Sequence, residues 1–331
     1  MSEYLLEVKD LKMYFPVGRG LKKNKTLLRA VDGVSFKLRA GETLGLVGES
    51  GCGKSTCGNC IVRLLNPTGG EIIFDGEDIA SKSQKALRPM RRDIQMIFQD
   101  PFSSLNPRMR VRDIIAEPLI THKVCASHAE QDAEVFRLMD AVGLPREYAD
   151  RYPHEFSGGQ RQRIGIARAL ALRPRLIICD EPVSALDVSI QAQILNLLSD
   201  LQKEFNLTYI FIAHGLPTVQ HISSQVAVMY LGKIVELADK VTLFRSPMHP
   251  YTEGLMAAVP IPDPSLRTDE GPMLEGDMPS PTHLPEGCRF HPRCKYCQER
   301  CKTESPELRD MGGGHYVACH YPLSGAAGIL K

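Results

Sequence analysis

The stretch Gly48-Glu49-Ser50-Gly51-Cys52-Gly53-Lys54-Ser55-Thr56 decides the fold of this chain. It matches the phosphate-binding loop pattern G-x-x-x-x-G-K-[ST] without a mismatch. The apolar residues 43–47 before it predict a buried strand, and residues 54–65 after it predict a helix that ends at Asn66-Pro67. A glycine-rich turn with a chance lysine would lack this strand, loop and helix, so the stretch predicts a nucleotide site.

The residue types of this loop suit the binding of phosphates. Glycines let backbone N–H groups turn toward a phosphate chain, where a Cβ would be in the way. The loop leads into a helix N-terminus, whose unpaired N–H groups attract anions. We expect Lys54 to reach the β- and γ-phosphates and Ser55 to place its hydroxyl on Mg²⁺.

Composition limits the remaining function classes. A chain of 331 residues can form one large domain and a smaller one, and 43% hydrophobic with 24% charged residues is ordinary for a soluble globular protein. A net charge of +1 gives no basic field for nucleic acid. No apolar run approaches the ~20 residues of a membrane-spanning helix. The N-terminus has no apolar signal-peptide core, so we expect the protein to stay on the side where it is made.

Strand and helix patterns alternate along the chain, which predicts an α/β core around a mostly parallel sheet. The expected strands are 5–14, 34–38, 43–47, 71–74, 94–98, 176–180, 208–213, 226–230 and 234–237, the last two as a hairpin about Leu231-Gly232. The expected helices are 54–65, 111–120, 129–142, 157 to about 172, and 189–205.

The buried strand 176–180 ends in two acids, Asp180 and Glu181. An acid at a strand tip beside a phosphate loop can hold Mg²⁺, often through water. A second acid next to it can orient and deprotonate an attacking water. We therefore expect Asp180 to bind Mg²⁺ and Glu181 to be the general base; the alternative for Glu181 is a solvated loop acid.

The stretch Ser157-Gly158-Gly159-Gln160 makes the chain resemble the ATP-binding-cassette (ABC) transporter ATPases, which carry this signature ahead of the Asp-Glu strand. The resemblance covers about residues 4–255. It implies that Gln99 is the Q-loop residue, a catalytic group and Mg²⁺ ligand, and that His214 is the switch histidine against the γ-phosphate.

Further positions match the same family. Ser184-Ala185-Leu186-Asp187 matches the D-loop, and Phe15 stands where the family places an aromatic ring against adenine, with Tyr14 as the alternative. One position departs from the pattern, because Gly215 follows His214 where the family usually has Asp. The missing carboxylate puts the rate of hydrolysis in doubt more than the activity itself.

The resemblance implies a fold and a domain organisation. The fold class is α/β, a P-loop NTPase of the ABC cassette type, with a mostly parallel sheet core, an antiparallel β subdomain and a helical subdomain at about 100–156. The ABC ATPase domain would span 1–258. A linker with seven prolines would follow at 259–287, and a cysteine-rich extension at 288–331.

A narrower resemblance is to the ATP-binding subunits of bacterial oligopeptide and dipeptide importers. It rests on residues 99–108, which read QDPFSSLNPR, and on the cysteine-rich tail. Tyr14-Phe15-Pro16-Val17 and the basic insert after it are similar to the F-type subunit. The resemblance implies ATP and Mg²⁺ as cofactors, and ATP bound between the phosphate loop of one subunit and residues 157–160 of the other.

The same resemblance implies the partners and the location. The partners would be a second ATPase subunit of the D-type, two membrane permeases and an extracytoplasmic peptide-binding protein, with no nucleic acid. The chain would lie at the cytoplasmic face of the inner membrane. Alternatives are the same motor importing nickel or another small solute, a soluble ABC protein of translation or DNA repair, and a regulatory cassette without hydrolysis. A single signature disfavours the soluble class, and the presence of Glu181 and His214 disfavours the regulatory one.

The ten cysteines fall into two groups. Five are scattered, which suits a reducing compartment, and five crowd between Cys288 and Cys319, which suggests a metal or cluster site. From spacing alone, zinc and iron–sulfur are evenly matched. The resemblance implies a four-iron–four-sulfur cluster on Cys288, Cys294, Cys301 and Cys319, with Cys297 as an extra. The alternatives are Zn²⁺ and a tail of free buried thiols.

Overall fold

The computed structural model describes residues 3–17, 26–259, 274 and 276–324. The chain separates into two units. The first unit comprises the described residues of Met1–Leu38, Leu44–Ala80 and Ala213–Lys331, and the second comprises Arg39–Thr43 and Ser81–Ile212. The basic stretch 18–25 and most of the proline-rich segment 259–287 lie outside the described residues.

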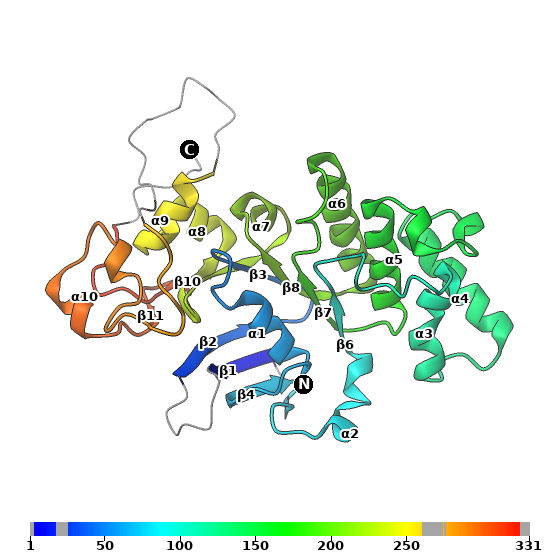
Figure 1. The fold of residues 1–331 in the computed structure, drawn as a ribbon, viewed down its shortest axis with the longest axis horizontal. Coiled ribbons are helices and arrows are strands. Elements are labelled where there is room, and N and C mark those ends of the chain that lie inside the picture. Colours follow the sequence, from blue (N-terminus) through cyan, green and yellow to red (C-terminus); the bar gives the residue numbers. More distant parts are fainter. Residues whose placement is uncertain (1–2, 18–25, 260–273, 275, 325–331) are drawn as a thin grey trace. The chain divides into compact units, whose positions relative to one another are not determined.

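An antiparallel sheet in the first unit contains the N-terminal strands (Figure 1). Its strands are β1 (Leu6–Val17), β2 (Thr26–Leu38), β4 (Gly69–Phe74) and β5 (Glu77–Asp78), in the order β2-β1-β4-β5. Strand β1 pairs with β2 and β4, so Leu6 lies opposite both Leu38 and Phe74. These three side chains are buried, as expected for the inner face of a sheet with one solvated side.

A second set of strands in the first unit leads into the phosphate loop. It consists of β3 (Thr43–Val47), β9 (Gln225–Tyr230), β10 (Lys233–Asp239), β11 (Arg309–Asp310) and β12 (Tyr316–Val317). Strand β3 runs parallel to β9, and β9 forms the predicted hairpin with β10. Leu231 and Gly232 at its turn have φ angles of 41° and 85°, as a type I′ turn requires. Strand β12 pairs with β10 and so ties the C-terminal residues to this sheet.

The helices of the first unit are α1 (Lys54–Ile61), α7 (Leu216–Ile222), α8 (Lys240–Arg245), α9 (Pro250–Ala257) and α10 (Glu299–Thr303), with a 3-10 turn η5 (His291–Arg293). Helix α1 is shorter than the predicted 54–65. Arg63 adopts a left-handed φ of 58°, and its Nε donates a 2.9 Å hydrogen bond to the carbonyl of Ile79. This conformation ends the helix before Asn66.

The strands of the second unit are parallel, in the order β8-β7-β6. They are β6 (Ile94–Ile97), β7 (Leu176–Asp180) and β8 (Thr208–Ala213). Strands β7 and β8 are buried along their whole length, which is usual for parallel strands covered on both faces. Asp180 and Glu181 follow at the carboxyl end of β7, where ligands of open α/β sheets bind.

Helices make up most of the rest of the second unit. They are α2 (Gln84–Leu87), η1 (Met90–Arg92), α3 (Val111–Thr121), α4 (His128–Ala141), η2 (Arg146–Tyr148), η3 (Pro153–Glu155), α5 (Gly158–Leu170) and α6 (Val188–Phe205). Helices α3, α4 and α5 pack on one another. The stripe Val135, Leu138, Met139 and Val142 is buried, as the helical spacing predicts. Within the described residues, no helix is both long and apolar enough to cross a bilayer.

Candidate active site

The phosphate loop lies between β3 and α1 in the first unit. Gly48, Gly51 and Gly53 have φ angles of 150°, 79° and 108°, a region that favours glycine. A Cβ on Gly48 would lie 2.1 Å from the carbonyl oxygen of Met229, and one on Gly53 would lie 2.0 Å from that of Ala30. The loop therefore needs glycine for its backbone angles and for the close approach of neighbouring strands.

Lys54 is held inside this loop. Its side chain is 3% exposed, and Nζ donates hydrogen bonds to the carbonyls of Gly48 (2.7 Å) and Glu49 (3.0 Å). Nζ also lies 3.5 Å from Nδ1 of His214. Because an ammonium group can only donate, this contact favours the ring tautomer with its proton on Nε2. The structure thus brings together two predicted phosphate contacts that are 160 residues apart.

His214 precedes a glycine at the start of a helix. Gly215 is the N-cap residue of α7 and offers no side chain to the helix end or to His214. A Cβ there would meet Thr218 Oγ1 at 3.7 Å and Pro217 Cδ at 3.8 Å, which are ordinary contact distances. The position therefore has room for a Cβ, so a steric clash at this atom is not the reason for glycine where the family usually has aspartate.

The second unit brings Gln99 and Glu181 together. Nε2 of Gln99 donates a 2.6 Å hydrogen bond to Oε2 of Glu181, which is 5% exposed. Glu181 has a left-handed φ of 47°, and its backbone N–H donates to the carbonyl of Ile212 at 3.0 Å. Asp180, one residue earlier, is 6% exposed. A strained backbone held in this way is typical of a functional residue.

The signature Ser157-Gly158-Gly159-Gln160 begins helix α5. Ser157 Oγ accepts from the N–H of Gln160 (3.4 Å), and Gln160 Oε1 accepts from the N–H of Ser157 (3.0 Å), which forms a capping box. A Cβ on Gly159 would lie 2.5 Å from Cγ2 of Ile190 in α6. The glycine therefore allows close packing of α5 on the helix that follows the D-loop.

The D-loop, residues 184–187, makes its contacts within the second unit. Ser184 Oγ donates a 3.1 Å hydrogen bond to the carbonyl of Glu181, and Asp187 is the N-cap residue of α6. The next residue, Val188, is 81% exposed. The D-loop is thus tied by its first residue to the predicted general base.

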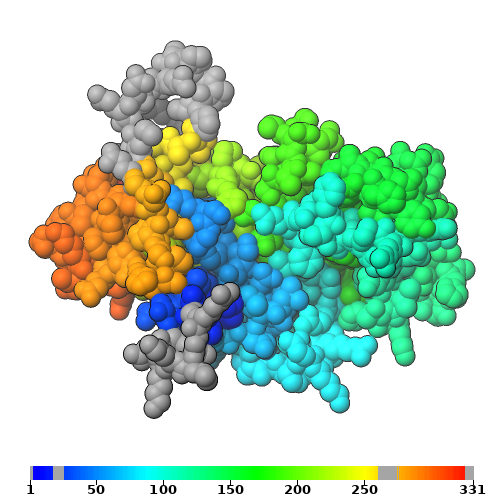
Figure 2. Space-filling view, viewed as in Figure 1, coloured from blue at the N-terminus to red at the C-terminus, as the bar shows by residue number. Residues whose placement is uncertain are grey.

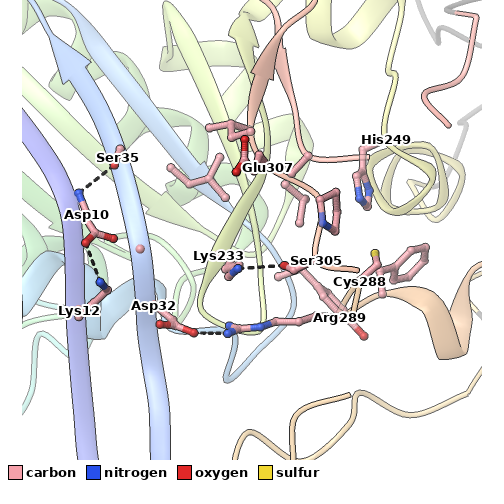
Figure 3. Close-up of a pocket in the computed structure, with 18 residues that line it drawn as sticks. Asp10, Lys12, Asp32, Ser35, Lys233, His249, Cys288, Arg289, Ser305 and Glu307 are labelled. Carbon is pink, nitrogen blue, oxygen red and sulfur yellow. Dashed lines mark hydrogen bonds and ion pairs between the residues drawn. The ribbon is translucent and has the colours of Figure 1, made fainter. Parts of the chain in front are cut away.

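The aromatic positions on β1 have different surroundings. Tyr14 donates a hydrogen bond from its hydroxyl to the carboxylate of Asp32, and burial together with that carboxylate raises the pKa of Tyr14 to about 12. Arg289 forms an ion pair with the same carboxylate (Figure 3). Phe15 is half-buried and has no hydrogen-bonding group. Because successive strand residues point to opposite faces, only one of the two rings can face a given ligand.

The predicted nucleotide-site residues that the structure describes lie partly in the first unit and partly in the second. The phosphate loop 48–56, Phe15 and His214 lie in the first unit, and Gln99, 157–160, Asp180 and Glu181 lie in the second. The predicted Mg²⁺ ligands are divided in the same way, with Ser55 in the first unit and Gln99 and Asp180 in the second.

The four cysteines of the predicted cluster line one small cavity of about 10 Å³, and Cys297 does not. All ten cysteines are free thiols. Burial raises the pKa of Cys288 to about 11 and that of Cys294 to about 12. Across the described parts of the chain, no group of three or more His, Cys, Asp or Glu side chains is placed to hold a metal ion. As they are placed, these side chains therefore do not form the predicted iron–sulfur centre.

Two arginines near these cysteines form ion pairs that the sequence did not predict. Arg289 pairs with Asp32, and Arg293 pairs with Glu49 of the phosphate loop at 2.7 Å. Each arginine is adjacent to a predicted cluster cysteine, Cys288 or Cys294. This stretch of sequence was therefore interpreted through its thiols. No spacing rule connects residues so far apart, so only the fold reveals these pairs.

A pocket of about 460 Å³ lies between β1, β2 and the C-terminal residues of the first unit (Figure 3). Asp10, Lys12, Asp32, Lys233 and Arg289 line it with mixed charge. Cys288 is the one predicted site residue in its lining, so this pocket is separate from the nucleotide loop.

Comparison with protein families identifies two matching regions. Residues 31–184 match the model described as "ABC transporter". Residues 235–301 match the model described as "Oligopeptide/dipeptide transporter, C-terminal region".

Curated relatives match along nearly the whole chain. The oligopeptide transport ATP-binding protein AppF of Bacillus subtilis is 54% identical over 96% of this chain and 98% of the relative. OppF of Haemophilus influenzae is 52% identical over 96% and 97%. The di/tripeptide transport ATP-binding protein DppF of Pseudomonas aeruginosa is 47% identical over 96% and 98%.

Solved structures of similar fold are ABC proteins. The ATP-binding cassette MJ0796, a dimer bound to ADP and Pi, aligns with a TM-score of 0.64 and 27% identity over 71% of this chain and 98% of that one. CbiO1 from Clostridium perfringens, part of the transporter complex cbiONQ, aligns with a TM-score of 0.63 and 27% identity over 73% and 91%. The fold is thus the ABC ATPase cassette, with α/β content and mixed sheets.

Proposed function

Because the chain belongs to the family of oligopeptide and dipeptide ABC transporter ATP-binding proteins, we propose that it hydrolyses ATP to power the import of di- and oligopeptides through a membrane permease complex. The observation that carries this proposal is the match, over nearly the whole chain, to relatives named for oligopeptide and di/tripeptide transport. The names of these relatives favour peptides over nickel as the cargo.

In the first unit, the phosphate loop binds the triphosphate of ATP. Lys54 supplies a positive charge at the loop carbonyls, and the N-terminus of α1 supplies unpaired N–H groups. Ser55 would contribute a hydroxyl to Mg²⁺, and Asp180 and Gln99 would be its other ligands. When bound, Mg²⁺ would supply positive charge that offsets the negative charge of the phosphates during transfer. Phe15 stacks on adenine, while Tyr14, its neighbour on β1, is tied by its hydroxyl to Asp32.

Glu181 accepts a proton from the water that attacks the γ-phosphate. Its carboxylate is held by the amide of Gln99, and its backbone by Ile212. A general base must lie within hydrogen-bonding reach of the proton that it removes. Gln99 therefore acts in catalysis by orienting this carboxylate, and a change of its position would change the rate of hydrolysis.

His214 donates from Nε2 to an oxygen of the γ-phosphate. The contact of Nδ1 with Lys54 favours the tautomer that leaves the Nε2 proton available. Gly215 provides no carboxylate to hold the ring. The contact with Lys54 therefore helps to orient His214.

Residues 157–160 act on the nucleotide of a partner subunit. The capping box orders the N-terminus of α5, and the first turn of this helix has no acidic residue, which suits an anion. The partner is a sister ATPase subunit of the D-type. The complete complex adds two membrane permeases and an extracytoplasmic peptide-binding protein, and places this chain at the cytoplasmic face of the inner membrane.

The test of this function is reconstitution. The chain is co-purified in mild detergent with its associated permeases and second ATPase, and the complex is placed in vesicles with ATP on the side of the ATPases. We expect ATP-dependent uptake of labelled di- and oligopeptides, and loss of uptake with Glu181→Gln. ATP-dependent uptake of nickel without peptide uptake would change the cargo. Co-purification of ribosomal or repair proteins in place of permeases would overturn the transport function.

Cys288, Cys294, Cys301 and Cys319 form the donor set for a four-iron–four-sulfur cluster. What favours this donor set is that these four thiols line one cavity while Cys297 does not, although the thiols as placed do not form a metal site. Four thiolates are the usual ligands of such a cluster. The cavity of about 10 Å³ accommodates about one water molecule, so these side chains must separate on loading.

The cluster is tested by anaerobic purification followed by assays for iron, acid-labile sulfide and zinc. We expect iron and sulfide in equal amounts, retained in Cys297→Ser and lost in Cys301→Ser. Stoichiometric zinc without sulfide would replace the cluster by a zinc site, and absence of all three would leave free thiols.

A further inference from the structure

The C-terminal segment, residues 288–324, reaches the phosphate loop through a partly buried ion pair. Both terminal nitrogens of Arg293 donate to the carboxylate of Glu49, at 2.7 Å and 2.9 Å. The side chain of Arg293 is 6% exposed and that of Glu49 is 26% exposed. A paired geometry with two hydrogen bonds is the stronger form of this interaction. In Figure 2 the orange C-terminal surface abuts the blue surface of the segment that carries the loop.

Glu49 is fixed at its backbone as well as at its side chain. Its N–H donates a 2.9 Å hydrogen bond to the hydroxyl of Tyr251, and its carbonyl accepts 3.0 Å from Lys54. The ring of Tyr251 packs against Tyr230 and Phe290, with ring centres 4.6 Å and 5.4 Å away. The first half of the phosphate loop is therefore held by residues of α9, β9 and the C-terminal segment.

A second arginine of the same segment supports the loop from another side. Arg289 pairs with Asp32 and donates to the carbonyl of Leu231. The next residue, Gly232, donates a 2.8 Å backbone hydrogen bond to the carbonyl of Cys52 in the loop. The C-terminal segment thus has two independent connections to residues that form the phosphate loop.

The charge on Glu49 links its ion pair with Arg293 to nucleotide binding. A carboxylate on a loop that binds three phosphates repels the ligand, and the repulsion is strong at a partly buried site. Arg293 neutralises this carboxylate within the pair. Removal of the arginine would leave the negative charge uncompensated beside the place where the phosphates bind.

We propose that Arg293 is a positioning residue for nucleotide binding, which holds and neutralises Glu49 and thereby lets the C-terminal segment set the affinity of the phosphate loop for ATP. The proposal concerns ATP binding by this chain and is independent of the transported cargo. It assigns the C-terminal segment a role at the nucleotide site whether or not its thiols hold a cluster.

An electrostatic role and a purely structural role predict opposite results for one variant. Under the electrostatic role, Glu49→Gln removes a repelling charge, leaves Arg293 positive and tightens ATP binding. Under a purely structural role, Glu49→Gln breaks the same ion pair as Arg293→Met and weakens ATP binding to the same extent. The sign of the change in Kd therefore separates the two.

The experiment is titration of the purified full chain with MgATP at low and high salt, for Arg293→Met, Arg293→Lys, Glu49→Gln and the double variant Arg293→Met/Glu49→Gln. We expect Arg293→Met to raise the Kd about tenfold and Glu49→Gln to lower it by a few-fold. The double variant should return toward the wild-type value, and Arg293→Lys should lie between Arg293→Met and wild type. All differences should shrink in high salt.

The matched control is Arg300→Met, which removes the exposed pair of Arg300 with Glu304 (2.7 Å) from the same segment and should leave the Kd unchanged. If Arg293→Met fails to fold, Arg293→Lys and Glu49→Gln still decide the matter by the sign of their changes. An unchanged Kd in Arg293→Met, or weaker binding in Glu49→Gln, would overturn the proposal.

Discussion

Gln99 donates a 2.6 Å hydrogen bond to the carboxylate of Glu181, 82 residues along the chain. The amide therefore fixes which carboxylate oxygen faces away from it, and the left-handed backbone at Glu181 fixes the position of the side chain. In the proposed mechanism these two residues act as a unit, in which Glu181 is the general base and Gln99 orients its carboxylate.

The first prediction concerns this pair. Glu181→Gln should lower ATP turnover by about 10²–10⁴-fold, the usual contribution of a positioned base, while ATP still binds. Gln99→Ala should lower kcat by roughly tenfold through loss of orientation. Turnover is measured in the reconstituted complex and binding in the isolated chain. Gln84→Ala, a change of an exposed glutamine in the same unit, is the control. Near-normal turnover of Glu181→Gln would exclude the role of general base.

A second prediction concerns Lys54. Lys54→Ala should raise the Kd for MgATP by about 10–100-fold, because it removes a buried cation whose hydrogen bonds to phosphates are charge-assisted. It should also lower hydrolysis, because His214 loses the contact at its Nδ1. Binding is measured by calorimetry, with Lys295→Ala at an exposed lysine of the same unit as the control. An unchanged Kd for Lys54→Ala would contradict the assignment.

The parts of the site that could be predicted are those in which local spacing and local structure coincide. The loop around Lys54 is recognisable because its glycines, its strand and its helix are consecutive in sequence. Asp180 and Glu181 are recognisable because they end a strand that is apolar throughout. Each of these signals lies within about ten residues, the range over which backbone preferences operate.

Contacts between distant segments could not be predicted in this way. The pair of Arg293 with Glu49 joins residues 244 apart, and nothing in either stretch specifies the partner. Helix α1 ends early because Arg63 finds an acceptor at Ile79, just after β5, a tertiary contact that outweighs helix propensity. The cysteine spacing suggested a metal centre, whereas the arrangement of thiols depends on a chain path that spacing does not define.

A third prediction concerns Gly159. Because a Cβ there would lie 2.5 Å from Cγ2 of Ile190, Gly159→Ala should cost about 1–3 kcal/mol of unfolding free energy through overpacking. The double variant Gly159→Ala/Ile190→Ala should recover most of this loss, as measured by urea unfolding. If the signature also binds a partner's nucleotide, the double variant should still fail to dimerise with ATP, whereas Ile190→Ala alone should dimerise. Normal dimerisation of the double variant would restrict Gly159 to a packing role.

The last prediction concerns the pH dependence of stability. His249 is 1% exposed, and burial lowers its pKa to about 4, against the opposing effect of Glu236. Its Nδ1 accepts a 3.1 Å hydrogen bond from the N–H of Tyr251, which requires an unprotonated nitrogen. In the unfolded chain the histidine takes up a proton near pH 6.5. Between about pH 6.5 and 4 the unfolded state therefore binds more protons, and stability falls as the pH falls.

This titration should remove about 2 kcal/mol of unfolding free energy between pH 7 and pH 5. The measurement is urea unfolding at both pH values for wild type and His249→Asn, since asparagine can still cap helix α9. The variant should be less stable at pH 7 because of lost packing, yet should lose about 2 kcal/mol less than wild type on acidification. His128→Asn, at an exposed histidine, should lose as much unfolding free energy on acidification as wild type. An equal loss in His249→Asn and wild type would show that another group titrates.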